Sequence, residues 1–219
     1  MQTRRSFIVK LCISLGGLCT GLTGGLLSLW AHTKRLIVPK GTTRESLIYR
    51  NPADLDPRNL DVTPLPDFGT MGATDIALDP TSWRLEVVGG SVSLLHVTFD
   101  EILTMPAIEK RVLMICPGFF VNYGNWKGIS IMALLERAGI DADVTSVEVK
   151  GHDRGSEKAV TYPLEHIRSN QVFLAYEVNG TRLPKKHGFP LRVVAEDYFG
   201  YDWVKYVFRV TAAIARAQK

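Results

Sequence analysis

The fold is organised around the stretch Val112-Leu113-Met114-Ile115-Cys116-Pro117-Gly118-Phe119-Phe120. Its first four residues are an apolar run, which is followed by a cysteine, a Pro-Gly break and two phenylalanines. A short, continuous apolar run is typical of a strand that is buried on both faces, and Pro-Gly is a strong signal for its end. Because functional side chains commonly emerge where such a strand ends, we expect Cys116 to reach a site. A cysteine also packs well in a core, so the strand alone leaves a packing role open.

The sequence around this stretch predicts more strand than helix. Thr98 and Glu101 have the spacing of a capping box, and Ser130 can cap a second helix. The expected helices cover residues 98–105, 131–138 and 162–169, and the expected strands cover residues 83–90, 94–97, 112–115, 144–151, 172–178, 181–183, 191–195 and 203–210. The aromatic-rich residues 119–126 are expected to form a loop. Because strands and helices follow one another irregularly, we predict an α+β fold with mixed sheets and short helices.

Residues 32–79 are rich in proline and poor in long apolar runs. This composition predicts an extended arm that wraps a core formed by a domain over residues 80–215. Within the arm, the stretch Val62-Thr63-Pro64-Leu65-Pro66-Asp67-Phe68-Gly69-Thr70-Met71-Gly72 brings glycines and hydroxyls together without a core pattern. The segment is either an ordinary loop or a lip over a ligand.

Residues 1–31 are typical of a targeting segment. Arg4 and Arg5, followed by Phe7 and Lys10, precede a glycine-rich apolar run, and this order resembles a twin-arginine (Tat) export signal. Export of this kind would place the protein in the periplasm. The residues before position 31 are a poor cleavage site, so an uncleaved N-terminal anchor stays open.

Charge and motif counts exclude several function classes. The formal charge of +4 falls to +1 when Arg4, Arg5 and Lys10 of the leader are set aside, so a nucleic-acid-binding surface is not expected. Cys116 is the one cysteine outside the leader, so no intramolecular disulfide is expected in the rest of the chain. The histidines and this cysteine lack zinc, haem and iron–sulfur spacings, and no dinucleotide loop, Walker A sequence or serine elbow occurs.

A single thiolate suits a transition metal that arrives with most of its own ligands. A phosphate-bearing cofactor that carries such a metal needs cations and backbone donors from other parts of the chain. The candidates are His187-Gly188 with Arg192, and Lys205 with Arg209.

Four segments, in this order, resemble the successive motifs of the sulfite-oxidase-type molybdopterin-binding domain. They are Ile115-Cys116-Pro117-Gly118, Trp126-Lys127-Gly128-Ile129-Ser130-Ile131, His187-Gly188-Phe189-Pro190-Leu191-Arg192-Val193-Val194 and Trp203-Val204-Lys205-Tyr206-Val207. Sulfite oxidases proper follow the cysteine with Ala-Gly-Asn-Arg, whereas the apolar and aromatic residues 117–120 follow it here, which weakens sulfite as the substrate. The chain resembles the minimal bacterial Tat-exported form, in the branch of the periplasmic methionine sulfoxide reductase catalytic subunit.

The resemblance implies a molybdenum ion held by a pyranopterin dithiolene, with Cys116 as the protein's thiolate ligand and catalytic residue. It also implies that His187, Gly188 and Arg192 contact the pterin or its phosphate and that Lys205 lies near that phosphate. Thr70, in the arm, would approach the cofactor.

The same resemblance implies an oxidoreductase that transfers an oxygen atom to or from a small sulfite-like or sulfoxide-like substrate in two-electron steps. Electrons would be exchanged with a membrane haem protein or a soluble cytochrome, and the Tat translocon would be a partner during export. The substrate and the direction of the reaction stay open. The alternative is a non-catalytic exported binding or scaffold domain that keeps the fold.

Overall fold

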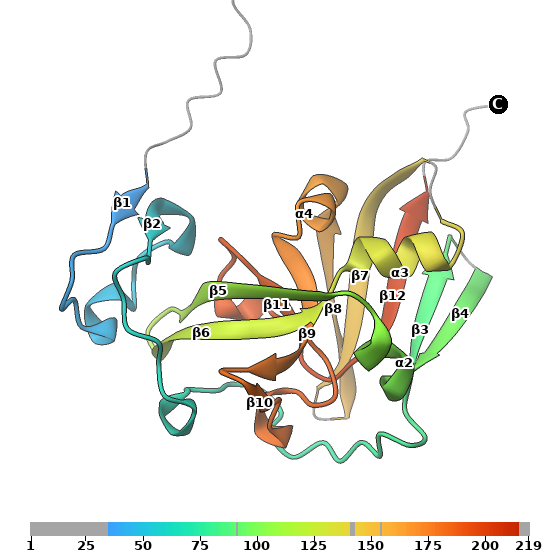
Figure 1. The fold of residues 1–219 in the computed structure, drawn as a ribbon, viewed down its shortest axis with the longest axis horizontal. Coiled ribbons are helices and arrows are strands. Elements are labelled where there is room, and N and C mark those ends of the chain that lie inside the picture. The colour runs from blue at the N-terminus through green and yellow to red at the C-terminus, as the bar shows by residue number, and fades with distance from the viewer. Residues whose placement is uncertain (1–34, 91, 141–142, 154, 215–219) are drawn as a thin grey trace, which may run out of the picture. The chain divides into compact units, whose positions relative to one another are not determined.

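The computed structural model describes residues 35–90, 92–140, 143–153 and 155–214 (Figure 1). These residues lie in one unit that begins at Arg35. The leader predicted over residues 1–31 lies outside the described residues, and the predicted boundary between arm and domain at residues 79 and 80 stays a prediction. No helix in the described part of the chain is both long enough and apolar enough to cross a membrane.

The first five-stranded sheet is built on a long antiparallel hairpin that ends beside Cys116. Its strand order is β10-β9-β6-β5, with β11 pairing with β9, and every pair is antiparallel. The strands are β5 (Ala107–Cys116), β6 (Phe120–Ile129), β9 (Val172–Val178), β10 (Thr181–Arg182) and β11 (Arg192–Ala195). Cys116 pairs with Phe120 at the turn, so the thiol sits at the tip of the hairpin.

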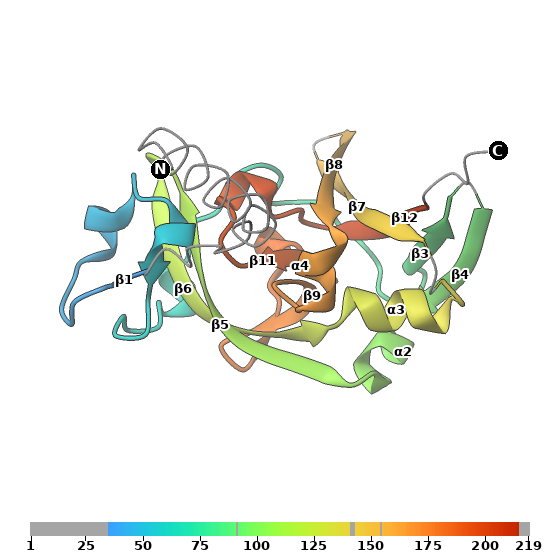
Figure 2. The ribbon, with the colours of Figure 1, turned by 90° about the horizontal axis from the view of Figure 1, so that it is seen from above.

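The second five-stranded sheet has the order β4-β3-β12-β7-β8. Its strands are β3 (Arg84–Gly89), β4 (Val92–Thr98), β7 (Val144–Asp153), β8 (Ser156–Pro163) and β12 (Val207–Ile214). β12 runs parallel to β3 and antiparallel to β7, which makes the sheet mixed, as predicted. In Figures 1 and 2 the β5–β6 hairpin runs from the β1–β2 end of the unit towards α2 and α3, which lie beside the second sheet.

In the described part of the chain three short α-helices connect the strands, and two of them begin at predicted caps. The helices are α2 (Phe99–Thr104), α3 (Ile131–Arg137) and α4 (Leu164–Arg168). Thr98 and Glu101 form the predicted capping box, and the Ser130 side chain accepts a hydrogen bond from the backbone N–H of Ala133. Capping of this kind satisfies backbone groups that a helix end leaves unpaired, so the caps define where these helices start.

The arm covers the outer face of the β5–β6 hairpin. Its short elements are β1 (Leu36–Ile37), η1 (Arg44–Leu47), η2 (Pro52–Asp54), β2 (Leu55–Asp56) and η3 (Leu65–Asp67). Val112 and Met114 of β5 face the main core, whereas Leu113 and Ile115 pack with arm residues in a second apolar cluster. Both faces of residues 112–116 are therefore buried, which explains why this half of β5 is continuously apolar.

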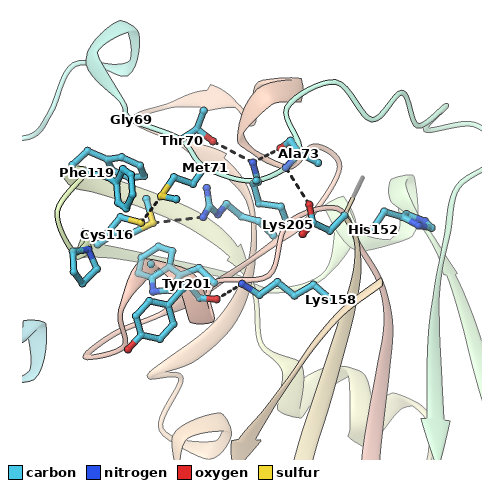
Figure 3. Close-up of a pocket in the computed structure, with 18 residues that line it drawn as sticks. Gly69, Thr70, Met71, Ala73, Cys116, Phe119, His152, Lys158, Tyr201 and Lys205 are labelled. Carbon is cyan, nitrogen blue, oxygen red and sulfur yellow. Dashed lines mark hydrogen bonds between the residues drawn. The ribbon is translucent and has the colours of Figure 1, made fainter. Parts of the chain in front are cut away.

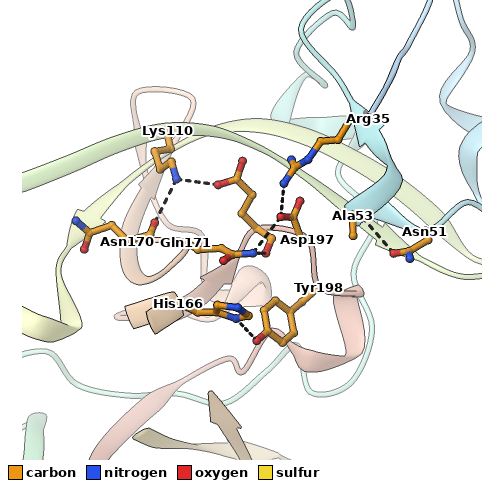
Figure 4. Close-up of polar contacts among 10 residues, drawn as sticks. Arg35, Asn51, Ala53, Lys110, His166, Asn170, Gln171, Asp197 and Tyr198 are labelled. Carbon is orange, nitrogen blue, oxygen red and sulfur yellow. Dashed lines mark hydrogen bonds and ion pairs between the residues drawn. The ribbon is translucent and has the colours of Figure 1, made fainter. Parts of the chain in front are cut away.

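Polar contacts also attach the arm to the rest of the unit and hold the loop that follows β11. Arg35 donates to the Asp197 carboxylate at 2.5 Å, and Lys110 of β5 pairs with Glu196 at 2.8 Å (Figure 4). The backbone N–H of Tyr123 donates to the Thr63 hydroxyl at 2.9 Å, and Thr63 returns a backbone hydrogen bond at 2.8 Å. The arm is thus attached to the loop after β11 and to β6.

Several sequence predictions differ from the structure, and strands β4 and β5 are longer than predicted. The aromatic residues predicted as a loop over 119–126 form most of β6, because alternate aromatic side chains pack into the two cores. The helix predicted from residue 162 begins at Leu164, since Tyr162 belongs to β8, a strand that the sequence analysis did not predict. The last strand begins at Val207 instead of Trp203, because residues 203–206 cross from η5 (Gly200–Asp202) to the second sheet.

Candidate functional site

A cavity of about 320 Å³ opens beside Cys116 (Figure 3). Its walls come from the arm loop 69–73, the end of β5 with the turn after it, the β7–β8 hairpin, the start of β11 and residues 200–205. These segments are far apart in sequence and belong to both sheets and the arm. The cavity therefore forms only where the two sheets and the arm meet.

Cys116 contributes a free thiol to the wall of this cavity. The residue is 6% exposed, and its Sγ lies 3.1 Å from the Sδ of Met71 in the arm loop. Burial raises the pKa of the Cys116 thiol, and the positive charge of Lys158 partly opposes that rise. Without a metal the residue stays protonated at neutral pH, whereas a bound cation favours the thiolate that a metal ligand requires.

The arm loop 69–73 lines one side of the cavity and is called the lip from here on, and whether it covers a ligand stays a prediction. The buried side chain of Asn122 accepts from the Gly69 N–H at 3.0 Å and donates to the Gly69 carbonyl at 2.9 Å. A side chain at Gly69 would put its Cβ 2.2 Å from the ring of Phe120. Glycine is thus required for the lip to lie this close to β6.

Arg192 lies at the base of the cavity as a buried cation. Its guanidinium donates to the His187 carbonyl at 3.1 Å and lies 5.1 Å and 5.5 Å from the ring centres of Trp126 and Trp203. No carboxylate among the described residues forms an ion pair with it. Burial lowers the pKa of Arg192 to about 10, so the side chain is charged at neutral pH and favours an anionic ligand.

His187 and Gly188 stand directly behind this cation. His187 is 1% exposed, and its Nε2 has no hydrogen-bond partner among the described residues. Burial, together with Arg192, Lys186 and Lys205, lowers the pKa of His187 to about 4, so its ring is neutral at pH 7. Gly188 has φ +104°, and a Cβ there would come 2.9 Å from the Cβ of Lys205.

Lys205 connects the lip to the base of the cavity. Its Nζ donates to the Thr70 hydroxyl at 3.2 Å, to the Lys186 carbonyl at 3.3 Å and to the Ala73 carbonyl. Thr70 in turn donates to the Lys186 carbonyl at 3.2 Å. The ammonium group therefore lies at the junction of three chain segments and faces the cavity.

The structure brings the predicted site residues together. Thr70, Cys116, Arg192 and Lys205 all line the cavity, and His187 and Gly188 contact Arg192 and Lys205 from behind. Their individual roles stay predictions. Arg209, which the sequence analysis paired with Lys205, does not line the cavity but donates to Glu86 at 2.6 Å across the second sheet.

Other cavity residues were not among the site residues predicted from the sequence. Met71, His152, Asp153, Lys158 and Tyr201 all contribute to the walls. The glycines around Met71 were the one available signal, because they marked the lip. The others lie in a hairpin and a 3₁₀ turn, and no motif in the sequence connects those segments with Cys116.

The donor set fits a metal that brings its own ligands. In the described parts of the chain, no group of three or more His, Cys, Asp or Glu side chains could hold a metal ion. The cavity instead offers one thiol and a buried guanidinium that forms no ion pair, and directly behind that guanidinium lies a buried imidazole nitrogen without a partner among the described residues. Fold and cavity thus define a domain for an anionic, metal-bearing cofactor.

Comparison with known families names that cofactor. The model of the oxidoreductase molybdopterin binding domain matches residues 71–219, so the chain belongs to this family of molybdopterin-dependent oxidoreductases. The membership that the sequence motifs predicted is therefore confirmed, as is the molybdenum–molybdopterin cofactor.

Individual relatives agree with this assignment. Mitochondrial sulfite oxidase of Rattus norvegicus is 30% identical over 68% of this chain and 33% of that protein. The protein-methionine-sulfoxide reductase catalytic subunit MsrP of Gluconobacter oxydans is 28% identical over 66% of this chain and 52% of that protein. The chain thus spans about a third of the length of the sulfite oxidase and about half of that of MsrP.

A solved structure supports the fold. The sulfane dehydrogenase SoxCD of Paracoccus pantotrophus superimposes with a TM-score of 0.57 at 24% identity, covering 65% of this chain and 41% of that chain. At this identity the likeness concerns the fold alone, and it confirms the predicted sulfite-oxidase-type fold.

Proposed function

We propose that the chain is a molybdenum enzyme that transfers an oxygen atom to or from a small sulfur-containing substrate in two-electron steps. The observation that carries the proposal is the opening of the Cys116 thiol onto the same cavity as Arg192 and Lys205. The names of the relatives, sulfite oxidase and protein-methionine-sulfoxide reductase, support a sulfite-like or sulfoxide-like substrate.

Each part of the cavity has a distinct role in this proposal. When bound, the cofactor supplies redox chemistry between Mo(IV) and Mo(VI). Cys116 holds the metal as a thiolate, and Arg192 and Lys205 bind the anionic groups of the cofactor. The neutral ring of His187 offers its unpaired nitrogen as a hydrogen-bond partner for the pterin.

The mouth of the cavity is apolar and aromatic, and we assign it to substrate admission. Phe119 and Tyr201 line the cavity and are 65% and 55% exposed. Large exposed apolar side chains around a cavity are typical of a binding surface. These rings would guide the substrate into the cavity beside Cys116 and would limit access of bulk water.

Electrons would pass to or from a partner, either a membrane haem protein or a soluble cytochrome. The described residues contain one free cysteine and no cluster of side chains that could hold a second redox metal. This supports an electron carrier on another protein. The Tat-like residues 4–10 support export to the periplasm. After export the leader would either be cleaved or stay attached as a membrane anchor.

Metal analysis tests the proposal most directly. Protein purified from a host that makes the cofactor should contain about one molybdenum per chain, and Cys116→Ser should remove both the metal and turnover. The unfolding midpoint of the cofactor-free Cys116→Ser protein should stay near that of the unchanged chain, which separates a lost ligand from a lost fold. A folded protein without molybdenum would favour the non-catalytic scaffold, and Cys116→Ser with full activity would refute the ligand assignment.

A substrate screen with artificial electron donors and acceptors determines the direction. Sulfite oxidation requires an acceptor dye, whereas sulfoxide reduction requires a donor dye, so the two reactions are measured separately on one preparation. Activity with neither substrate class in the molybdenum-loaded protein would overturn the proposed reaction.

A further inference from the structure

The β7–β8 hairpin directs one lysine into the cavity. Lys158 lies opposite Gly151 in the antiparallel register, so these two residues share a face of the hairpin. A Cβ at Gly151 would come 2.0 Å from the Lys205 carbonyl oxygen, which identifies this face as the one packed against residues 204–205. Lys158 accordingly lines the cavity together with Cys116 and Lys205.

The neighbouring lysine of the same hairpin points the other way. Lys150 lies opposite Ala159, one position along each strand, and therefore on the opposite face. It pairs with Glu148 at 3.6 Å and does not line the cavity. The hairpin thus presents one cation to the cavity and a second cation of the same type away from it.

Lys158 is the cavity cation whose position fits a substrate rather than the cofactor. Arg192 is held between two tryptophan rings and Lys205 is held by the lip, whereas the Nζ of Lys158 donates to the carbonyl of Tyr201 at the mouth (Figure 3). Among the described residues Lys158 forms no ion pair, although its charge acts on both Asp202 and Cys116.

The side chains that follow Cys116 carry no positive charge, so an anionic substrate would need a cation from another part of the cavity. Pro117, Phe119 and Phe120 line the cavity next to the thiol, and their side chains carry no donor for an anion. A small oxyanion that reacts beside Cys116 loses its water shell on entry and needs a charged donor in exchange. Lys158 is a flexible donor on the wall that the β7–β8 hairpin forms, in the same cavity as Cys116.

We propose that Lys158 binds the oxyanion group of the substrate and thereby makes the cavity selective for a small anionic substrate over a neutral one. The inference rests on the proposed oxygen-atom transfer and names the substrate class of that reaction. The positive charge that binds the anion thus comes from the β7–β8 hairpin, and the segment after the cysteine is left to form the apolar mouth.

Steady-state kinetics of the molybdenum-loaded full chain test the inference with two substrates, sulfite and the neutral methyl phenyl sulfoxide. Lys158→Met should raise the KM for sulfite about 10- to 100-fold more than the KM for the sulfoxide, because a charge-assisted hydrogen bond is lost for one substrate alone. Lys158→Arg keeps the positive charge, so its KM for sulfite should stay close to that of the unchanged protein. Lys150→Met removes the same charge from the opposite face and should leave both KM values unchanged.

Sulfate binding provides a readout that does not depend on turnover. Calorimetry on the loaded protein should show that Lys158→Met weakens sulfate binding about 10- to 100-fold, whereas Lys150→Met does not. Equal effects of the two substitutions on sulfite KM and sulfate affinity would overturn the inference. If the unchanged protein turns over neither substrate, the proposed reaction fails, and sulfate affinity alone then decides for or against Lys158.

Discussion

Asn122→Ala is expected to release the lip of residues 69–73 from the β5–β6 hairpin. The Asn122 side chain is fully buried, and both polar atoms of its amide bond to the backbone of Gly69, at 3.0 Å and 2.9 Å. Each such bond contributes about 0.5–1.5 kcal/mol net, so the substitution should cost about 1–3 kcal/mol of stability. The cost should be concentrated in the lip, because the two bonds connect β6 with nothing else.

Native-state hydrogen exchange measures this local effect. The Gly69 amide should exchange roughly 5- to 150-fold faster in Asn122→Ala, which is the same free energy expressed as a ratio of open to closed lip. Molybdenum content should fall in parallel, since the lip carries Thr70 and Met71 into the cavity.

Asn125→Ala is the matched control. Asn125 lies three residues further along β6, and its amide donates to the carboxylate of Glu109 at an exposed position. Its removal should change the unfolding free energy by less than about 0.5 kcal/mol. If the two variants show the same exchange rate at Gly69 and the same unfolding free energy, the assignment of Asn122 as the anchor of the lip is wrong.

Three further predictions concern the base of the cavity. Gly188→Ala should destabilise the protein by about 1–3 kcal/mol in urea unfolding, because φ is +104° and the new Cβ would press on Lys205. Arg192→Met should leave the cofactor-free protein at least as stable in thermal unfolding, since an unpaired buried charge is removed, yet should lower its molybdenum content. The cofactor-free protein should lose stability as the pH falls from 6.5 to 4, because in this window the unfolded chain protonates His187 while the folded chain, with its pKa near 4, does not. His187→Gln should remove on the order of 3 kcal/mol of this pH dependence, and an unchanged pH profile would contradict the reasoning.

Local patterns predicted the elements whose causes lie within a few residues. The capping box at Thr98 and the cap at Ser130 are set by hydrogen bonds over three residues, and both occur in the structure. The apolar run before Cys116 predicted a strand buried on both faces, which the two apolar clusters confirm. The local sequence was thus sufficient to predict the strand that ends at Cys116.

Long-range packing accounts for what the sequence did not reveal. Strand β6 looked like an aromatic loop because its alternation is visible only when the two clusters that receive its side chains are known. Lys158 lines the cavity because the register of β7 and β8 places its side chain on that face of the hairpin. No sequence motif specifies this register, which depends on how the two strands pair. His187, Gly188, Arg192 and Lys205 were selected through the family resemblance, and the structure supplies the reason for their proximity, which is the crossing of residues 203–206 behind β11.

The walls of the cavity have a consequence for how the protein matures. They run from Gly69 to Lys205, and Lys205 precedes β12, which lies between β3 and β7 in the second sheet. A nascent chain therefore has no complete cavity until the residues through β12 have left the ribosome, and the complete cavity cannot hold the cofactor before that point. Until the cofactor is bound, the Cys116 thiol is an unligated group on the wall of the cavity, so early binding of the cofactor would also protect that thiol from oxidation.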